Sequence, residues 1–470
     1  MSSSRKYLRI SGRPGSFSGT VRLPPSKSYL HRALFVAGQV LGQSTVANCG
    51  SVTNDDIVAT IGALRLLGSA IKFSNSRNGS YQIVPGSPES DSLILNAEGS
   101  GTTARFLIPY SSLSPTGTKV KIIGNESLSK RPMDTIFETL SRLGVTAKSL
   151  SDDSKLPVEV EGGGIQGGEC EIDGSVSSQF VSGLLISCVR ARRDTLLSIN
   201  NPEDQVSTPY IDATVQVLRA FGFKIRITRA EDGKYSSFAI PGNQLEKGTK
   251  FIVPGDMSSA AALISAAMAT GGRVDLTNAG EKNFPQPDAA ILQVAKRFGA
   301  NIECGNGTIA VSFRGQKIRR KLLLDLKNSP DLVPSVAGLA AATETPLSIT
   351  NIGHLRFKES DRITVLAREL SKIGVITSQT KSSLELLSFR SEKDRKDNTF
   401  LCPEGDHRML MALTIAGLSG HFGTMYIEDP DCVRKSYPSF VKDLQRLCHG
   451  RSALKIVSSR RLVRKNFEST

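Results

Sequence analysis

The chain has 470 residues, of which 39% are hydrophobic and 22% are charged, and both values are ordinary for a globular protein. It carries 59 lysine and arginine residues against 44 aspartate and glutamate residues, a formal net charge of +15. No apolar run approaches the ~20 residues that a membrane span needs, and the N-terminus lacks the apolar segment of a signal peptide, so we expect no membrane association.

The cysteines and histidines indicate neither disulfides nor a metal site. Seven cysteines are scattered without a C-x-x-C pair, and five histidines show no ligand spacing. This pattern is typical of reduced thiols, so we expect a cytoplasmic protein. Part of the excess positive charge lies in residues 317–321 and 460–465, and a solvated surface explains most of it. Nucleic-acid binding is a weaker alternative than a basic site for small anions, because zinc-finger, helix-turn-helix and RNP-type motifs are missing and tryptophan is absent.

A short phrase, Leu-x-x-(Leu/Phe/Ile)-Gly followed by a β-prone stretch, recurs at steps of 74 to 78 residues. Each copy predicts an amphipathic helix that ends at a left-handed glycine. Units of this length are too small to bury a good core alone, so we expect six copies of one unit in two groups of three. The copies end at Gly68, Gly144, Gly222, Gly299 and Gly374, and a sixth, Leu444-Gln-Arg-Leu-Cys448, lacks the glycine.

Each repeat also contains the start of another helix, where small or polar residues precede an apolar or alanine-rich run. Backbone amides and the helix dipole favour anions at such a start. Six starts in register predict anion binding in addition to a core. They are Ser26-Lys27-Ser28, Ser100-Gly101-Thr102-Thr103, Ser177-Ser178-Gln179, Asp256-Met257-Ser258-Ser259, Asp331 and Asp406-His407-Arg408.

Several of these residues have both a structural and a functional explanation. Lys27 and Arg32 suit a phosphate at the first start, but they are equally compatible with plain surface charges. Asp331, taken alone, is expected to be an N-cap aspartate. Lys358 and Arg362 lie four residues apart and would share a helical face if a helix begins at Lys358, where a salt-bridged helix start is the simpler interpretation.

Together these phrases resemble, in order and nearly whole, the motifs of the 5-enolpyruvylshikimate-3-phosphate synthases (3-phosphoshikimate 1-carboxyvinyltransferases), a family of enolpyruvyl transferases. The resemblance spans essentially the whole chain, and its wording is closer to archaeal than to enteric-bacterial members. The strongest matches are Leu23-Pro-Pro-Ser-Lys-Ser28 with Arg32, Ser177-Ser-Gln-Phe180, Asn351-Ile-Gly-His-Leu-Arg-Phe-Lys-Glu-Ser-Asp-Arg362 and Asp406-His-Arg-Met409.

The resemblance implies an α/β (α+β) fold of two similar domains, each of three βαβαββ repeats in an inside-out, barrel-like arrangement, with the active site in the interdomain cleft. One domain is expected at residues 22–250, with most shikimate 3-phosphate contacts. The other is expected at residues 1–21 plus 251–470, with the catalytic carboxylates and the phosphoenolpyruvate contacts. The implied reaction transfers the carboxyvinyl group of phosphoenolpyruvate to the 5-hydroxyl of shikimate 3-phosphate, releasing phosphate, on the shikimate pathway to chorismate and aromatic amino acids. The implied protein is a monomer without metal or organic cofactor.

Carried over position by position, the resemblance implies Asp331 as the base on the attacking hydroxyl, Glu359 as an acid or proton relay, and Lys27 as a catalytic contact to both substrates. The implied shikimate 3-phosphate contacts are Lys27, Ser28, Arg32, Ser177, Ser178, Gln179, Ser207, Asp331, His354 and Lys358, with Tyr210 alongside. The implied phosphoenolpyruvate contacts are Lys27, Gly101, Arg131, Gln179, Arg362, Arg408 and Lys435.

Three positions depart from residues that many relatives have. Residues 98–102 read Glu-Gly-Ser-Gly-Thr and lack an asparagine amide. Ser127 replaces an arginine, so Arg131 or Lys130 would have to supply that charge. His354 replaces an asparagine and could hydrogen-bond the sugar with pH-sensitive strength.

Two other functions are weaker alternatives. The enolpyruvyl transferase that acts on UDP-N-acetylglucosamine typically has a cysteine in the loop before Arg131-Pro132 and Ser-Lys-Asn in the first motif, and this chain has neither. A non-catalytic relative would be expected to lose a carboxylate or a cation of the site. All of Asp331, Glu359, Arg362, Arg408 and Lys435 are present.

Overall fold

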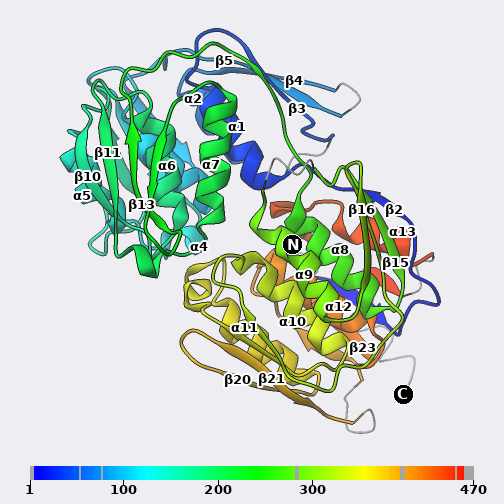
Figure 1. Cartoon of the computed structure of the whole chain (residues 1–470). Coiled ribbons are helices and arrows are strands. Elements are labelled where there is room, and N and C mark those ends of the chain that lie inside the picture. The colour runs from blue at the N-terminus through cyan, green and yellow to red at the C-terminus, as the bar shows by residue number, and fades with distance from the viewer. Residues whose placement is uncertain are drawn as a thin grey trace. The chain divides into compact units, whose positions relative to one another are not determined.

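The computed structural model describes residues 5–51, 54–75, 78–280, 285–391, 397–449 and 453–459. Six sheets of four strands each are formed by these residues, and helices alternate with the strands along the chain (Figure 1). In the described part of the chain no helix has the length and apolar character that crossing a membrane requires. The basic segment at residues 460–465 lies outside the described residues.

One βαβαββ unit recurs six times with the same strand pairing. In the second repeat β6 (Ser92–Asn96) runs parallel to β7 (Lys119–Ile123), β7 pairs antiparallel with β9 (Val158–Glu161), and β9 pairs antiparallel with β8 (Ala147–Ser149). The other sheets repeat this order as β14-β3-β5-β4, β10-β11-β13-β12, β2-β15-β17-β16, β18-β19-β21-β20 and β22-β23-β1-β24. The sixfold repeat and the fold class expected from the sequence are therefore confirmed.

The chain divides into two compact units. The contiguous unit holds residues 25–254 with residues 285–287, and the interrupted unit holds residues 5–24, 255–280 and the described residues from 288 onward. The contiguous unit contains α1 (Lys27–Ala37), β3 (Ser44–Ala47), α2 (Asp55–Leu66), β4 (Ala70–Ser74), β5 (Ser80–Val84), β6, α3 (Gly101–Ser111), β7, α4 (Glu126–Ser129), α5 (Phe137–Arg142), β8, β9, β10 (Gly168–Asp173), α6 (Ser178–Cys188), β11 (Thr195–Asn200), α7 (Pro209–Ala220), β12 (Arg226–Arg229), β13 (Tyr235–Ile240) and β14 (Lys250–Ile252).

The interrupted unit has the same plan but draws its strands from both ends of the sequence. Its elements are β1 (Lys6–Ser11), β2 (Thr20–Arg22), α8 (Met257–Ala269), β15 (Arg273–Thr277), α9 (Ile291–Arg297), β16 (Asn301–Gly305), β17 (Thr308–Ser312), β18 (Leu322–Asp325), α10 (Val333–Ala342), β19 (Leu347–Thr350), α11 (Arg362–Lys372), β20 (Val375–Gln379), β21 (Leu384–Phe389), β22 (Thr399–Leu401), α12 (His407–Leu418), β23 (Thr424–Glu428), α13 (Phe440–Leu447) and β24 (Leu454–Ser458).

Strands β2 and β14 each belong to the sheet of one unit, although the helix that follows each strand belongs to the other unit. Strand β2 precedes α1 but pairs with β15, whereas β14 precedes α8 but pairs with β3. The chain crosses between the units at Pro24–Pro25 and at Pro254–Gly255, and residues 285–287 belong once more to the contiguous unit. Strand β1 lies between β23 and β24 and is antiparallel to both. Each unit thereby has complete four-stranded sheets.

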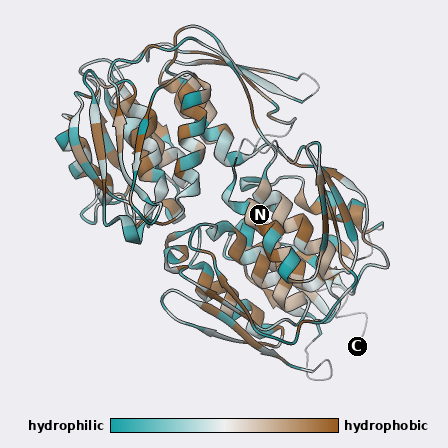
Figure 2. Ribbon diagram, in the orientation of Figure 1, coloured by the Kyte–Doolittle hydropathy of each residue, from teal (hydrophilic) through white to brown (hydrophobic). Residues whose placement is uncertain are grey.

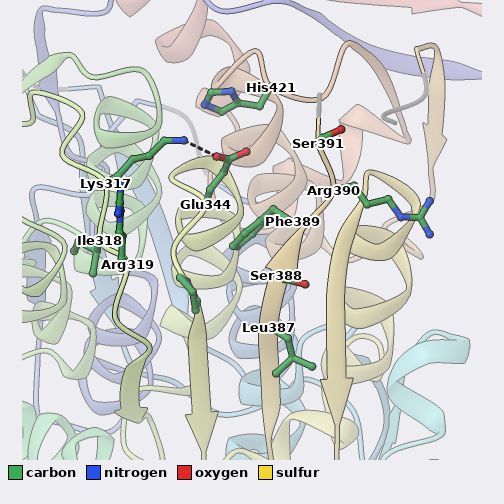
Figure 3. A pocket seen from close by; sticks show the side chains of 11 residues that line it. Lys317, Ile318, Arg319, Glu344, Leu387, Ser388, Phe389, Arg390, Ser391 and His421 are labelled. Carbon is green, nitrogen blue, oxygen red and sulfur yellow. Dashed lines mark hydrogen bonds and ion pairs between the residues drawn. The ribbon is translucent and has the colours of Figure 1, made fainter. Parts of the chain in front are cut away.

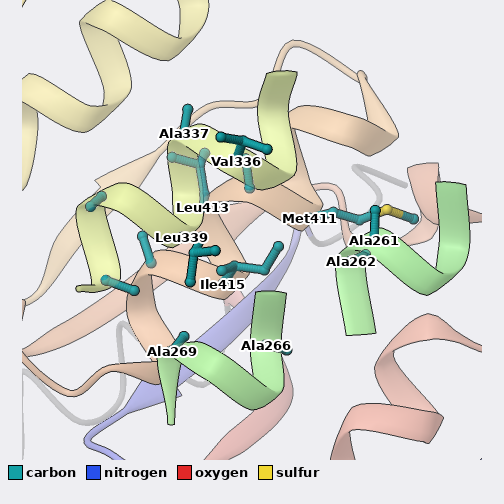
Figure 4. Packing of buried hydrophobic residues seen from close by; sticks show 14 of the residues in the cluster. Ala261, Ala262, Ala266, Ala269, Val336, Ala337, Leu339, Met411, Leu413 and Ile415 are labelled. Carbon is teal, nitrogen blue, oxygen red and sulfur yellow. The ribbon is translucent and has the colours of Figure 1, made fainter. Parts of the chain in front are cut away.

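Three apolar helices form the centre of each unit. In the interrupted unit α8, α10 and α12 pack through small residues such as Ala261, Ala266 and Ala337 (Figure 4). A Cβ at Gly338 would overlap the carbonyl oxygen of Ala412, so the glycine sets how closely α10 approaches α12. Strands such as β6 and β18 alternate buried and exposed side chains, and Figure 2 shows both brown and teal residues along the strands. Helices therefore lie inside each unit and sheets outside.

The recurring glycine phrase has a direct structural cause. Gly68, Gly144 and Gly222 follow helix ends with φ of +99°, +74° and +97°. The amide after each glycine bonds back to the carbonyl of the first residue of the phrase, as Val145 does to Leu140 at 2.9 Å. The sixth copy ends one residue later than the phrase predicts, because His449, at φ +46°, takes the left-handed position instead of Cys448.

Candidate active site

Arg362 is the centre of a buried ion cluster in the interrupted unit. Its side chain is 1% exposed, and it donates hydrogen bonds to three carboxylates: Nε to Asp406 Oδ2 at 2.8 Å, Nη1 to Asp331 Oδ1 at 2.9 Å and Nη2 to Glu359 Oε2 at 2.7 Å. Burial alone would lower the pKa of Arg362, but the three carboxylates outweigh burial and hold it above its usual value. The guanidinium is therefore charged, and its orientation is fixed from three directions.

Local capping places these groups. Asp361 caps α11 by accepting a hydrogen bond from the amide of Thr364 at 3.1 Å, so Arg362 becomes the first residue of that helix. Asp406 caps α12 by accepting from the amide of Arg408 at 2.9 Å. Arg362 is thus the first residue of α11, and Arg408 is the second residue of α12, each close behind a capping aspartate.

Asp331 joins two arginines. Its Oδ2 accepts a hydrogen bond from Arg408 Nη2 at 2.8 Å, while its Oδ1 accepts from Arg362. Burial would raise the pKa of Asp331, but Arg408, Arg362 and Lys358 outweigh burial and hold the pKa well below its usual range. Its side chain is 23% exposed, so an ionised carboxylate is both fixed and accessible.

Two structural explanations offered by the sequence are wrong. Asp331 caps no helix, because it lies in a 3-10 turn (Pro330–Leu332) and α10 begins after it at Val333 without a side-chain cap. Lys358 does not share a helical face with Arg362, because its backbone is extended and α11 begins only at Arg362. Both residues precede the first residue of an α-helix, so the 3.6-residue spacing of an α-helix does not set the directions of their side chains.

Glu359 and Lys435 extend the cluster. Glu359 Oε1 lies 3.3 Å from Lys435 Nζ, and its Oε2 pairs with Arg362. Lys435 ends a 3-10 helix (Pro430–Lys435) that follows β23. The site thus combines cations and carboxylates from four segments of one unit.

His354 behaves differently from the expectation of a pH-sensitive contact. Burial and the charge of Lys358 lower the pKa of His354 to about 3, so the imidazole is neutral throughout the physiological range. Its Nε2 is buried and makes no hydrogen bond with the residues that the structure describes. His354 therefore offers a neutral ring nitrogen to a ligand, with no change in charge near pH 7.

The contiguous unit holds a second cluster, at the N-termini of α1, α3 and α6. Lys27 is the first residue of α1, and its Nζ lies 2.6 Å from Asp56 Oδ2 on α2. Ser177 caps α6, and Gln179 links α6 to α3, because its Nε2 donates to Thr102 Oγ1 at 2.9 Å. Ser178 lies between them as the first residue of α6.

Three polar groups converge on Gly101, the first residue of α3. A Cβ added to Gly101 would lie 3.0 Å from Arg131 Nη1, and 3.6 Å from both Arg105 Nη1 and Gln179 Oε1. Arg105 Nη1 donates to Gln179 Oε1 at 2.8 Å. Glycine at this position therefore leaves room for two guanidinium groups above a helix N-terminus, which is a favourable arrangement for an anion.

Arg32 and Ser207, two further predicted site residues, are both buried in the contiguous unit. Arg32 is 2% exposed and donates to Thr214 Oγ1, to the carbonyl oxygens of Ser28 and Tyr210, and to Ser182 Oγ, so most of its donors are used within the protein. Ser207 is buried with φ +57°, a left-handed conformation that is uncommon for serine and is often found at functional sites.

Sequence reasoning missed several members of these clusters. Asp56 follows Asn54 and Asp55 at an ordinary helix start, and only the fold brings it to Lys27. Arg105 is not among the missed residues, because it repeats the cation-after-a-helix-start pattern of Arg32 and was recognisable from the sequence on that ground. Asp288 had no signal, because it lies in a 3-10 turn (Pro287–Ala290) outside every motif. Among the described residues no group of three His, Cys, Asp or Glu side chains is arranged to hold a metal ion.

A surface pocket of about 530 Å³ lies at the other end of the buried helices of the interrupted unit. Glu344 follows the end of α10 and His421 follows the end of α12, whereas Asp331 and Arg408 lie at the starts of these helices. Lys317 pairs with Glu344 at 2.9 Å beside Phe389, and Arg390 lines the pocket further from this pair (Figure 3). The basic segment 317–321 thus borders this pocket and is separate from the arginine cluster.

The fold and the two clusters define a class: an α/β protein of repeated βαβαββ units that gathers cations at the N-termini of buried helices. A family model described as EPSP synthase (3-phosphoshikimate 1-carboxyvinyltransferase) matches residues 12–444. The 3-phosphoshikimate 1-carboxyvinyltransferase of Methanosarcina mazei is 36% identical over 443 residues, covering 94% of this chain and 98% of the relative. That of Korarchaeum cryptofilum is 36% identical over 438 residues, covering 93% and 98%.

Solved structures agree with these relatives. An EPSP synthase from Acinetobacter baumannii superimposes with a TM-score of 0.72 at 26% identity, covering 97% of this chain and 100% of that one. The enolpyruvyl transferase NikO from Streptomyces tendae has a TM-score of 0.74 at 18% identity over 97% of this chain and 100% of its own, which supports the fold alone. The chain belongs to the EPSP synthase (3-phosphoshikimate 1-carboxyvinyltransferase) family.

The buried cluster predicts a large stability effect at Arg362. Arg362→Gln would leave three carboxylates without their shared cation and should destabilise the interrupted unit by about 3–5 kcal/mol at pH 7 to 8. Without the guanidinium the carboxylates take up protons more easily, so the loss should shrink as the pH falls toward 5. Urea unfolding at several pH values measures this.

Arg273→Gln is the matched control, because it breaks an ion pair whose side chains are 46% and 38% exposed. It should cost no more than about 1 kcal/mol at any pH. Equal losses for the two variants would show that Arg362 is not the shared partner of these carboxylates.

Proposed function

We propose that the chain transfers the carboxyvinyl group of phosphoenolpyruvate to the 5-hydroxyl of shikimate 3-phosphate and releases phosphate. Family membership supports the reaction, and the observation that carries it to this chain is the Asp331–Arg362–Arg408 cluster. The reaction needs a base for the hydroxyl proton, a proton for the enol methylene carbon and cations for two anionic substrates. Together with Glu359, which pairs with Arg362, the cluster offers a carboxylate for each proton transfer and cations for the substrates in one unit.

Asp331 is proposed as the base. The two arginines keep it ionised in the ligand-free protein, so it accepts a proton without first losing one. A substrate anion that engages Arg408 would draw that guanidinium away from the carboxylate. Loss of the Arg408 partner raises the affinity of Asp331 for a proton. Binding of phosphoenolpyruvate at Arg408 would therefore make Asp331 a stronger base. Glu359, held between Arg362 and Lys435, is proposed as the acid or relay.

The substrate contacts follow the two clusters. In the contiguous unit Lys27 is held by Asp56, and a ligand anion would compete with that carboxylate. The proposed contacts for shikimate 3-phosphate are Lys27, Ser28, Arg32, Ser177, Ser178, Gln179, Ser207, Asp331, His354 and Lys358. Those for phosphoenolpyruvate are Lys27, Gly101, Arg131, Gln179, Arg362, Arg408 and Lys435.

We propose that Arg131, not Lys130, supplies the charge that Ser127 lacks. Arg131 is 5% exposed and its guanidinium lies above Gly101, where its Nη2 also donates to Ser127 Oγ at 3.5 Å. Lys130 is 70% exposed and pairs with Glu126 on the surface. The guanidinium of Arg131 therefore occupies the space next to residue 127, and the amine of Lys130 does not.

The setting proposed for the reaction is the cytoplasm, with a monomeric enzyme. All seven cysteines are free, and Cys49, Cys170, Cys188 and Cys448 are buried. Burial raises the pKa of the Cys49, Cys170 and Cys448 thiols, which keeps them protonated and unreactive. Unpaired structural thiols are typical of a reducing compartment.

Phosphate release from phosphoenolpyruvate tests the proposed function. Purified protein should release phosphate with shikimate 3-phosphate as acceptor and not with UDP-N-acetylglucosamine. Release with only the sugar nucleotide would assign the other enolpyruvyl transfer. If neither acceptor supports release although shikimate 3-phosphate still binds, the chain is a binding protein and the proposed reaction is wrong.

Asp331→Asn tests the base. The amide keeps the shape of the side chain but cannot take the hydroxyl proton, so kcat should fall by about 10²–10⁴-fold. Shikimate 3-phosphate should bind within a few-fold of the parent, as measured by calorimetry. Equal losses of binding and turnover would contradict the assignment.

Arg131→Gln and Lys130→Gln test the replacement of the missing arginine. Losing a charged hydrogen bond to phosphoenolpyruvate should raise its KM by about 10–100-fold in the Arg131 variant. The Lys130 variant should match the parent, because that side chain is exposed and paired on the surface. A larger effect in the Lys130 variant would reverse the assignment.

A further inference from the structure

Asp288 is a buried carboxyl group that the proposed mechanism does not use. It lies in the 3-10 turn before α9 and is 2% exposed. The hydroxyl of Ser258, the second residue of α8, donates a hydrogen bond to Asp288 Oδ2. The other oxygen, Oδ1, is buried and makes no hydrogen bond with the described residues. A charged carboxylate with one oxygen unsatisfied would be costly in this position.

The charges around Asp288 add to this cost. Asp331 belongs to the arginine cluster, and Asp256 caps α8, so two further carboxylates face Asp288. Arg408 is the cation that faces it, and Arg408 is already bonded to Asp331 at 2.8 Å. Burial first, and then the charge of Asp331, raise the pKa of Asp288 to about 7, although Arg408 and the Ser258 hydrogen bond act in the opposite direction.

Asp288 and Asp331 therefore form a pair of neighbouring carboxyl groups in opposite environments. Two arginines hold Asp331 ionised, while burial and the charge of Asp331 favour the protonated form of Asp288. Neighbouring carboxyl groups whose surroundings separate their proton affinities commonly divide the tasks of an active site. When Asp288 carries a proton, Asp331 is the one charged carboxylate of this pair, and Arg408 has to balance only that charge.

We propose that Asp288 is a positioning residue of this site, which holds a proton beside Asp331 and thereby leaves Arg408 available to an anionic substrate. The part of this inference that names phosphoenolpyruvate rests on the proposed function. Loss of the proton turns Asp288 into a second carboxylate whose charge acts on Arg408. That carboxylate competes with the substrate anion for the guanidinium and repels it. The affinity for phosphoenolpyruvate therefore falls as the pH rises through about 7.

The protonation itself is tested without any substrate. Because folding raises the pKa of Asp288, the native state binds more protons than the unfolded state between about pH 4 and 7, and its stability falls as the pH rises through that range. Asp288→Asn keeps an oxygen that accepts from Ser258 and never ionises. Its melting temperature should therefore exceed that of the parent at pH 8 and approach it at pH 5.

The infrared spectrum gives a second readout that needs only the parent protein. A band of a protonated carboxyl group should be present at pH 6, should weaken by pH 8, and should be reduced in Asp288→Asn at pH 6. Asp275→Asn, an exposed change in the same unit, is the control and should alter neither the band nor the pH dependence of melting. An unchanged band in the Asp288 variant, or a melting difference independent of pH, would overturn the proposal.

The kinetic test compares KM for phosphoenolpyruvate in parent and Asp288→Asn from pH 6.5 to 8.5, so that titration of the substrate itself affects both equally. The parent KM should rise relative to the variant by about three- to tenfold over this range, as expected for one partly screened charge. The kcat ratio should change less. Parallel KM profiles would overturn the proposal even if phosphate release is normal. Absence of phosphate release in both proteins would contradict the proposed function, and the melting and infrared results would then decide the protonation of Asp288 alone.

Discussion

The ion pairs of the buried Arg362 guanidinium are the interaction on which the arrangement of the site in the interrupted unit depends. A buried cation is tolerated only when its donors are satisfied and its charge is balanced, and here three carboxylates from three segments provide both. The same bonds fix Asp331 and Glu359 before any ligand arrives. The groups proposed as base and as acid or relay are therefore already in place and need little reorganisation when charge moves during the proposed reaction.

The repeat supplies the frame for that cluster. A helix that is apolar around most of its surface must be enclosed, and three such helices with alanine and glycine at their contacts can approach closely at the centre of a unit. The sides of these helices are covered by apolar packing, so polar side chains of the site can be placed only at the helix ends, here the N-termini. Arg408 at α12, Lys27 at α1 and Gly101 at α3 are all such positions.

Residues with local causes were predictable from the sequence, and residues placed by the fold were not. The helix ends at Gly68 and Gly144 were readable, because a left-handed glycine and its backbone bonds lie within one phrase. The prediction of Asp331 as a site residue stays a prediction, and its expected structural role as an N-cap is wrong, since its partners Arg362 and Arg408 lie 31 and 77 residues away in the chain. Asp56 and Asp288 escaped notice for the same reason. The neutral state of His354 could not be predicted from the sequence either, because burial is the largest cause of its low pKa.

The exchange of β2 and β14 between the units has a consequence for the order in which the protein can fold during synthesis. The contiguous unit has all its strands once β14 has been made, so it can form while the rest of the chain is still missing. Strand β1 is made first, yet its partners β23 and β24 are made last. The first strands of the chain must therefore remain unpaired while an entire unit is built between them and their partners. The backbone amide and carbonyl groups of β1 therefore lack their sheet partners until the end of the interrupted unit has been made.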